Sequence, residues 1–127
     1  MIRDTINVSF PAQKCYALLL RMFVSGSAAS YDLGVDMLED LRMAAEEAYD
    51  YLLCSVRGDE QLLCDIYRDE SNTVSMNLRL SGRSGKPITQ QENEISYTIL
   101  KTLMNDVTLF ADNAGATGVR MTLKAEK

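Results

Sequence analysis

Three acidic side chains close together in the sequence are the residues of this chain best suited to chemistry. Glu46, Glu47 and Asp50 lie within residues 36–56, where apolar side chains recur at steps of three and four. That period predicts an amphipathic helix with one face in a core. Glu47 then falls on the opposite face, where an acid either lines a pocket or finds a partner, because unpaired burial is costly. The three acids could bind a cation, but a solvated helix face is the preferred interpretation.

The helix predicted over residues 36–56 is the longest element that the pattern indicates. Asp36 followed by Glu39 is typical of a capped helix start. Its expected core stripe consists of Leu38, Leu41, Ala45, Ala48, Leu52 and Val56. The expected opposite face contains Met43, Glu47, Asp50, Tyr51 and Cys54. Because that face is not purely polar, we expect the helix to be covered on both sides.

Other residue types exclude several kinds of site. The chain has no histidine, which removes histidine bases and most zinc and haem sites. Its three cysteines, Cys15, Cys54 and Cys64, show no paired spacing, so we expect buried free thiols in a reducing compartment. A net charge of −5 without a basic cluster argues against nucleic-acid binding. The apolar run 17–24 is too short to span a bilayer and is interrupted by Arg21, so we expect a cytoplasmic protein.

The rest of the sequence predicts a single domain with two layers. Alternating apolar residues mark a strand over residues 2–10, and residues 74–80 alternate most cleanly. Residues 81–91 predict a loop, and Thr89 with Glu92 is typical of a capping box before a helix. The expected elements are strand 2–10, helices 12–27 and 36–56, strands 62–67 and 74–80, a helix around 95–104, and strands 107–112 and 119–123. This order favours an α+β two-layer sandwich, in which a mostly antiparallel (mixed) sheet of about five strands carries three helices on one face.

Several motifs resemble those of anti-sigma-factor serine kinases, which belong to the GHKL superfamily of histidine-kinase-type ATPases. The stretch DLRMAAEEA, residues 40–48, is similar to the opening of the family's conserved helix, D-I-x-x-A-V-x-E-A-x-x-N-A. FPA, residues 10–12, resembles the family's I-P-A step from strand to helix, and residues 99–107 resemble its L-x-L-M-x-x-L-M-D-E-V ending. Residues 115–123 are similar to its closing G-G-T-x-V-x-L strand. The resemblance covers essentially the whole chain and implies one GHKL-like domain over residues 1–127.

The resemblance also implies a nucleotide site, most of which is missing here. Glu47 matches the glutamate proposed in the family as the base for phosphoryl transfer. Four residues later, a magnesium-binding asparagine is replaced by Tyr51, which is a poor magnesium ligand. The adenine-reading D-x-G-x-G motif corresponds to LSGRSG, residues 80–85, which has no aspartate, and the glycine-rich turn before the last helix has no glycine. The degenerate nucleotide positions are Tyr51, Leu80, Gly82 and Ser96.

A second segment has the composition of a phosphate-binding loop. Gly82, Arg83, Gly85 and Lys86 combine two glycines with two cations. Such a combination in a surface segment is usually just a turn, and we prefer that interpretation.

The resemblance therefore implies a regulatory module with the family's fold but without ATP binding or kinase activity. Such a module would bind a protein partner, such as a sigma factor or an anti-sigma antagonist, in bacterial transcription regulation, and would form a homodimer. No cofactor, metal, nucleic acid or membrane is expected. One alternative is an active serine/threonine kinase that binds ATP and magnesium with Glu47 as base, but catalysis also needs a positioned metal and substrate. Another is an unrelated small α+β interaction domain.

Overall fold

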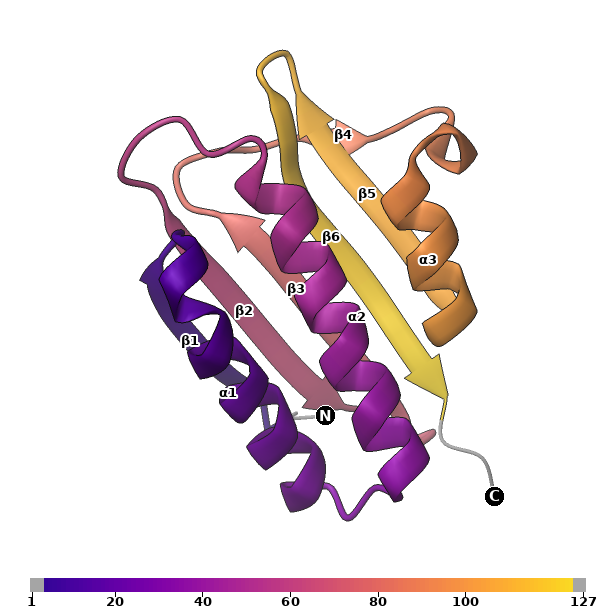
Figure 1. Cartoon of the computed structure of the whole chain (residues 1–127). Helices are drawn as coiled ribbons and strands as arrows, with labels where there is room; N and C mark the ends of the chain where they lie inside the picture. The colour runs from indigo at the N-terminus through magenta and orange to yellow at the C-terminus, as the bar shows by residue number, and fades with distance from the viewer. Residues whose placement is uncertain (1–3, 125–127) are drawn as a thin grey trace.

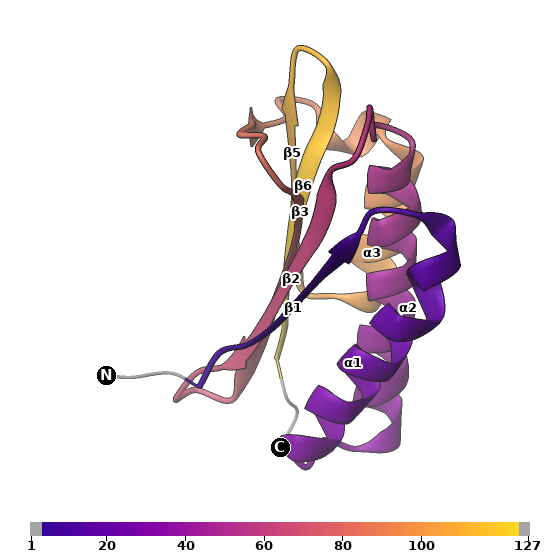
Figure 2. The same cartoon turned by 90° about the vertical axis from the view of Figure 1, so that its left-hand side faces the viewer.

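The computed structural model describes residues 4–124, which form two layers: a six-stranded sheet and three α-helices on one face of it (Figures 1 and 2). The α-helices are α1 (Ala17–Ser30), α2 (Val35–Leu53) and α3 (Ile95–Leu103). The strands are β1 (Ile6–Pro11), β2 (Gln61–Arg68), β3 (Thr73–Leu80), β4 (Lys86–Pro87), β5 (Asp106–Asp112) and β6 (Gly115–Lys124). Two short 3-10 helices, η1 (Lys14–Tyr16) and η2 (Gln91–Asn93), precede α1 and α3. The expected α+β class with three helices on one face is confirmed.

The sheet differs from the expected one in two respects. Its strand order is β1-β2-β3-β6-β5-β4, and every described pair of neighbours is antiparallel, so the sheet is not mixed. It also has six strands where about five were expected, because β4 lies in residues 81–91, which the sequence predicts as a loop. Lys86 pairs with Ala111, and Pro87 pairs with Phe110, at the sheet edge. Proline is tolerated at an edge because it cannot donate a hydrogen bond to a further strand, and a strand of two residues leaves no periodic pattern in the sequence.

The core lies between the sheet and the helices, where alternate strand residues meet the apolar face of α2. Within the sheet, Ile66 is opposite Met76, which is opposite Met121, and all three side chains are fully buried. The residues that alternate with them along each strand, such as Asn77, therefore point to the open face of the sheet. In Figure 1, α2 lies between α1 and α3. Its buried residues are Leu41, Ala44, Ala45, Ala48, Tyr49 and Leu52. The expected stripe residue Leu38 is half-buried, and Val56, also half-buried, lies beyond the helix, which ends at Leu53 rather than residue 56. Ile2, which belongs to the first predicted strand, lies outside the described residues.

The expected helix caps are wrong. Gly34 is the N-cap of α2 and makes no side-chain hydrogen bond, so Asp36 lies inside the first turn, where its charge still favours the helix dipole. Thr89 and Glu92 do not form a capping box for α3, because Glu92 lies within η2 and the N-cap of α3 is Glu94. The first helix likewise begins at Ala17 rather than residue 12, after a 3-10 turn. None of the helices in the described part of the chain is long and apolar enough to cross a bilayer.

The three cysteines are free thiols, but only one of them is buried as expected. Cys64 of β2 is completely inaccessible, and burial raises the pKa of its thiol well above the ordinary value. Cys15 and Cys54 are exposed. Cys54 is the C-cap of α2, and Cys15 lies in η1. Apolar neighbours in the sequence were therefore not enough to bury these two thiols.

Candidate functional site

A cavity of about 550 Å³ lies on the helix side of the sheet, beside the C-terminal half of α2. Its walls come from α2, from the segment that leads into α3, and from the β5–β6 hairpin. The lining residues that carry acidic or hydroxyl groups are Glu47, Asp50, Tyr51, Ser55, Glu94 and Ser96. Glu47 and Tyr51 of one helix and Ser96 of another are positions that the resemblance identifies, and the fold brings them to one cavity.

Packing of α2 against the sheet determines where Glu47 points. Ala44, Ala45 and Ala48 are completely buried, so the helix is held with Glu47 away from the core and within hydrogen-bond distance of Ser96 of α3. Glu47 therefore lies opposite the core stripe, as predicted, but the expectation that this face is covered is wrong for most of it: Glu47 and Tyr51 are half-buried, whereas Met43, Asp50 and Cys54 are exposed. The Ser96 hydroxyl donates a hydrogen bond of 2.8 Å to Glu47 Oε2. This bond fixes the Glu47 carboxylate against the first turn of α3.

The electrostatics of the cavity are one-sided. Glu47, Asp50 and Glu94 all line it, and no lysine or arginine of residues 4–124 does so. Burial raises the pKa of the Tyr51 phenol above its ordinary value, and the neighbouring Glu94 carboxylate raises it further. Three carboxylates in one cavity repel an anion and attract a cation. The arrangement therefore opposes binding of a triphosphate unless cations neutralise it.

The two other degenerate positions lie outside this cavity. Leu80, at the end of β3, is completely buried in the core, where it is opposite Leu62. Gly82 lies in the turn that follows, with a φ of +71° that favours glycine. Neither residue lines the cavity. Of the four degenerate positions that the resemblance implies, only Tyr51 and Ser96 therefore meet in the structure.

Arg83, which the sequence suggested as part of a surface turn, is instead a central structural contact. Its guanidinium group donates to both oxygens of Asp112, at 3.0 and 3.3 Å, and to the backbone carbonyl of Ser55 at 2.7 Å. Glu60 Oε2 lies 3.5 Å away, and only 10 % of the Arg83 side chain is exposed. Because these acceptors occupy the guanidinium group, it is not available to bind a phosphate. Arg83 connects the segment after β3 to the end of α2 and to the β5–β6 hairpin.

Hydrogen bonds lower the pKa of both acidic partners of Arg83. The hydrogen bonds from Arg83 hold the pKa of the Asp112 carboxyl at about 2, and the Ala114 backbone N–H adds to the effect. The pKa of Glu60 is lowered mainly by hydrogen bonds from the backbone N–H groups of Arg57 and Gly58. Both carboxylates are therefore ionised at neutral pH and keep the arginine paired.

Gly85 completes this attachment, and the sequence indicated only that it lies in a turn. A Cβ atom at this position would lie 2.8 Å from the backbone carbonyl of Ala111 and still closer to the Thr117 hydroxyl. Glycine is therefore required for the segment to cross β5 and β6 this closely. We call residues 81–87 the strap, because Arg83 and Gly85 hold them across the sheet end.

Comparison with known proteins adds no assignment to this geometry. No family model matches the chain, and no curated protein matches it. Within residues 4–124, no three histidine, cysteine, aspartate or glutamate side chains are grouped to hold a metal ion.

Proposed function

We propose that this chain is a regulatory protein-binding module of the anti-sigma-factor type that works without nucleotide. The observation that carries the proposal is the location of the exposed apolar side chains. Seven large hydrophobic residues are at least 40 % exposed, and all belong to the three helices: Leu18, Leu19, Met22, Val35, Met43, Ile95 and Ile99. Within residues 4–124, no large hydrophobic residue with this degree of exposure lies on the open face of the sheet. Because all seven lie on the helix layer, this layer is the better candidate for a protein-docking surface.

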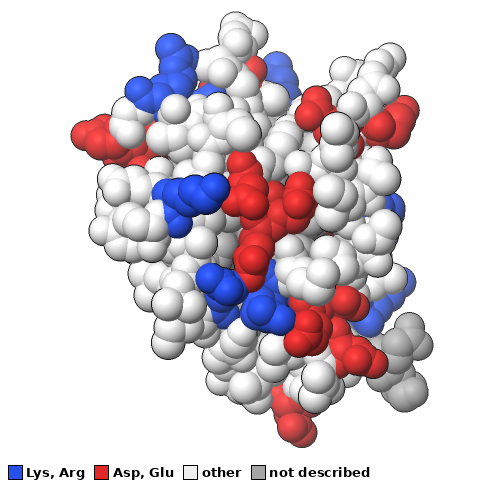
Figure 3. Space-filling model, viewed as in Figure 1, with Lys and Arg blue, Asp and Glu red and all other residues white. Residues whose placement is uncertain are grey.

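The charge of the helix layer indicates the chemistry of the partner. α2 alone contains six acidic residues and one arginine, and acidic side chains gather over α2 in the middle of this face (Figure 3). Arg42 is already paired with Glu39, and Arg21 of α1 is paired with Glu46. A partner surface that combines basic and apolar side chains would complement this layer. The resemblance names a sigma factor or an anti-sigma antagonist as that partner.

The proposed homodimer would use the outer face of α1. Leu18 and Met22, one turn apart, are 57 % and 64 % exposed. Two copies joined through α2 would place like charges against each other, which is unfavourable. Pairing through α1 leaves the acidic face of α2 for a basic partner.

Two observations bear on the alternatives. The cavity beside Glu47 retains the acid that an active kinase would use as base, but its carboxylates would have to be neutralised before ATP could enter. The same cavity is a reason to prefer a GHKL-like module over an unrelated α+β domain, because three of the five positions that the resemblance identifies line it: Glu47, Tyr51 and Ser96. The binding module without nucleotide chemistry accounts for both observations.

Calorimetric titration with ATP or ADP, each with magnesium, tests the absence of nucleotide chemistry. We expect no heat of binding up to millimolar nucleotide. The Tyr51→Asn variant should behave in the same way, because residues 80–85 still lack an adenine-reading aspartate. Glu47→Gln should leave stability and partner binding nearly unchanged. Micromolar ATP binding, or a phosphorylated product that disappears in Glu47→Gln, would establish the kinase alternative instead.

Charge substitutions on the helix layer test the docking surface. We expect Met22→Glu to convert a dimer into a monomer in analytical ultracentrifugation. Met43→Lys should weaken capture of a sigma factor or its antagonist at least about tenfold, since it removes an apolar contact and places a positive charge against a basic partner. Thr108→Glu, on the open face in register with Arg120, is the matched control and should change neither. Loss of capture by the control variant alone would place the partner on the other face.

A further inference from the structure

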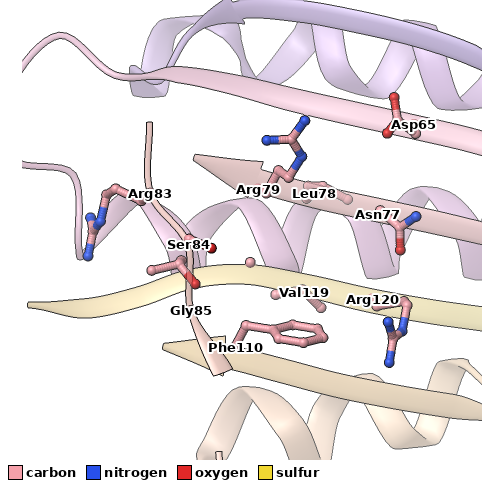
Figure 4. A pocket seen from close by; sticks show the side chains of 12 residues that line it. Asp65, Asn77, Leu78, Arg79, Arg83, Ser84, Gly85, Phe110, Val119 and Arg120 are labelled. Carbon is pink, nitrogen blue, oxygen red and sulfur yellow. The ribbon is translucent and has the colours of Figure 1, made fainter. Parts of the chain in front are cut away.

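A second hollow, of about 330 Å³, lies on the open face of the sheet, away from the helices (Figure 4). In the sheet register, Arg79, Gly118 and Phe110 lie opposite one another on β3, β6 and β5. Gly118 has no side chain, so the floor between Arg79 and Phe110 is bare. Ser84 and Gly85 of the strap form one wall. The hollow therefore exists because a glycine in mid-strand lies beside a strap that is firmly attached.

Two arginines lie on opposite rims of this hollow, and neither is paired with an acidic side chain of the described chain. The side chains of Arg79 and Arg120 are exposed, and within residues 4–124 their guanidinium groups make no ion pair or hydrogen bond. Arg120 lies over the Phe110 ring, 5.1 Å from its centroid. Arg83, by contrast, is fully occupied by its acidic partners. A guanidinium group matches a carboxylate in shape and charge, so the two free arginines indicate an anionic group on the ligand.

The neighbouring row of the sheet supplies hydrogen-bond acceptors. Asp65, Asn77 and Arg120 lie opposite one another on β2, β3 and β6, and all three line the hollow. The Oδ1 atom of Asn77 is inaccessible to solvent and has no hydrogen-bond partner. Buried acceptors are almost always satisfied. An orphaned amide oxygen beside a carboxylate therefore indicates a ligand that donates hydrogen bonds and carries positive charge at this end.

We propose that this hollow binds a small zwitterion of the free amino acid class. The exposed Arg79 and Arg120 side chains turn in from the two rims toward the ligand carboxylate. The ligand ammonium group donates to Asp65 and, once the Asn77 amide has rotated into the hollow, to Asn77 Oδ1, and the apolar side chain of the ligand lies beside Phe110. The volume is at the lower end of the range for small-molecule sites, about 300–1,000 Å³, which suits a ligand of this size. A phosphate ion fits less well, because it would meet the Asp65 carboxylate and has too few donors for the acceptors. The site is on the opposite face from the proposed docking surface and does not depend on it.

Nuclear magnetic resonance of ¹⁵N-labelled protein tests the proposal with defined probes. We expect L-leucine and L-phenylalanine to give saturable shifts at the backbone amides of Asn77, Gly118 and Arg120. Phenylacetate, which lacks the ammonium group, and phenethylamine, which lacks the carboxylate, should each bind at least about tenfold more weakly than L-phenylalanine, because each loses a charge-assisted contact. Inorganic phosphate should also bind more weakly.

Three variants assign the contacts. Arg79→Gln combined with Arg120→Gln should weaken L-phenylalanine binding by at least about tenfold. Asp65→Asn should weaken L-phenylalanine binding but not phenylacetate binding. Arg57→Gln removes an exposed arginine outside the hollow and serves as the control, with unchanged affinity expected. The absence of saturable shifts with both amino acids, equal binding of phenylacetate, or tighter binding of phosphate would each overturn the proposal.

Discussion

Replacing Gly85 by alanine is expected to destabilise the protein by about 3 kcal/mol. The new Cβ would lie 2.8 Å from the carbonyl carbon and oxygen of Ala111, closer than side chains approach backbone atoms in folded proteins. Ala111 is held in β5 by its pairing with Ala116 and with Lys86. Relief of the clash therefore requires the strap to lift from the sheet. Urea unfolding, followed by circular dichroism, measures the loss.

A second glycine provides the control for this experiment. A Cβ atom at Gly58 would meet nothing within 4 Å, and its φ is not positive. Gly58→Ala should therefore change the free energy of unfolding by less than about 0.5 kcal/mol. A small effect of Gly85→Ala, similar to that of the control, would mean that the strap is not closely attached to β5.

Replacing Arg83 by methionine is expected to cost about 2 kcal/mol in the free energy of unfolding. Methionine keeps most of the apolar length of the side chain but removes the bonds to Asp112 and to the carbonyl of Ser55. The acceptors left behind lose their partner in a region where only 10 % of the arginine side chain was exposed. Ser84→Ala, at an exposed neighbouring position, is the control and should have almost no effect.

The pH dependence of stability distinguishes loss of this ion pair from a general packing defect. The folded pKa of Asp112, about 2, lies below its ordinary value of 3.8. Asp112 therefore contributes stability above about pH 4, and this contribution is lost as the pH falls towards 2. In Arg83→Met the pKa of Asp112 should return towards its ordinary value, so this part of the acid dependence disappears. If the free energy of unfolding falls equally steeply between pH 4 and pH 2 in the wild type and in Arg83→Met, the pairing of Asp112 with Arg83 is contradicted.

The strap joins the two candidate sites physically. Arg83 contacts the end of α2, next to the helix-side cavity, while Gly85 forms a wall of the open-face hollow. Ser55, which accepts the bond from Arg83, also lines the helix-side cavity. Release of the strap should therefore disturb both sites. The two substitutions at Gly85 and Arg83 are expected to weaken ligand binding on the open face as well as stability.

Local periodicity determined the elements that could be predicted from the sequence. The alternation over residues 74–80 identified the buried face of β3, because residues two positions apart lie on the same face of a strand. The three- and four-residue steps identified the buried face of α2, because residues at that spacing lie on the same face of a helix. The same reasoning placed Glu47 on the outer side of α2. Two predictions that depend on tertiary contacts rather than on local periodicity were wrong: Asp36 does not cap α2, and Cys54 is exposed.

The contacts that shape the candidate sites were decided by tertiary structure alone. Glu47 meets Ser96, 49 positions away, and Arg83 meets Asp112, 29 positions away. Neither pair has a local pattern that connects its members, and the two-residue strand β4 is too short to have any period. The sequence determined which faces of α2 and β3 are apolar, since periodicity acts over a few residues. Only folding brought together the acids of one cavity and the free arginines of the other, because strand order and register determine which distant side chains become neighbours.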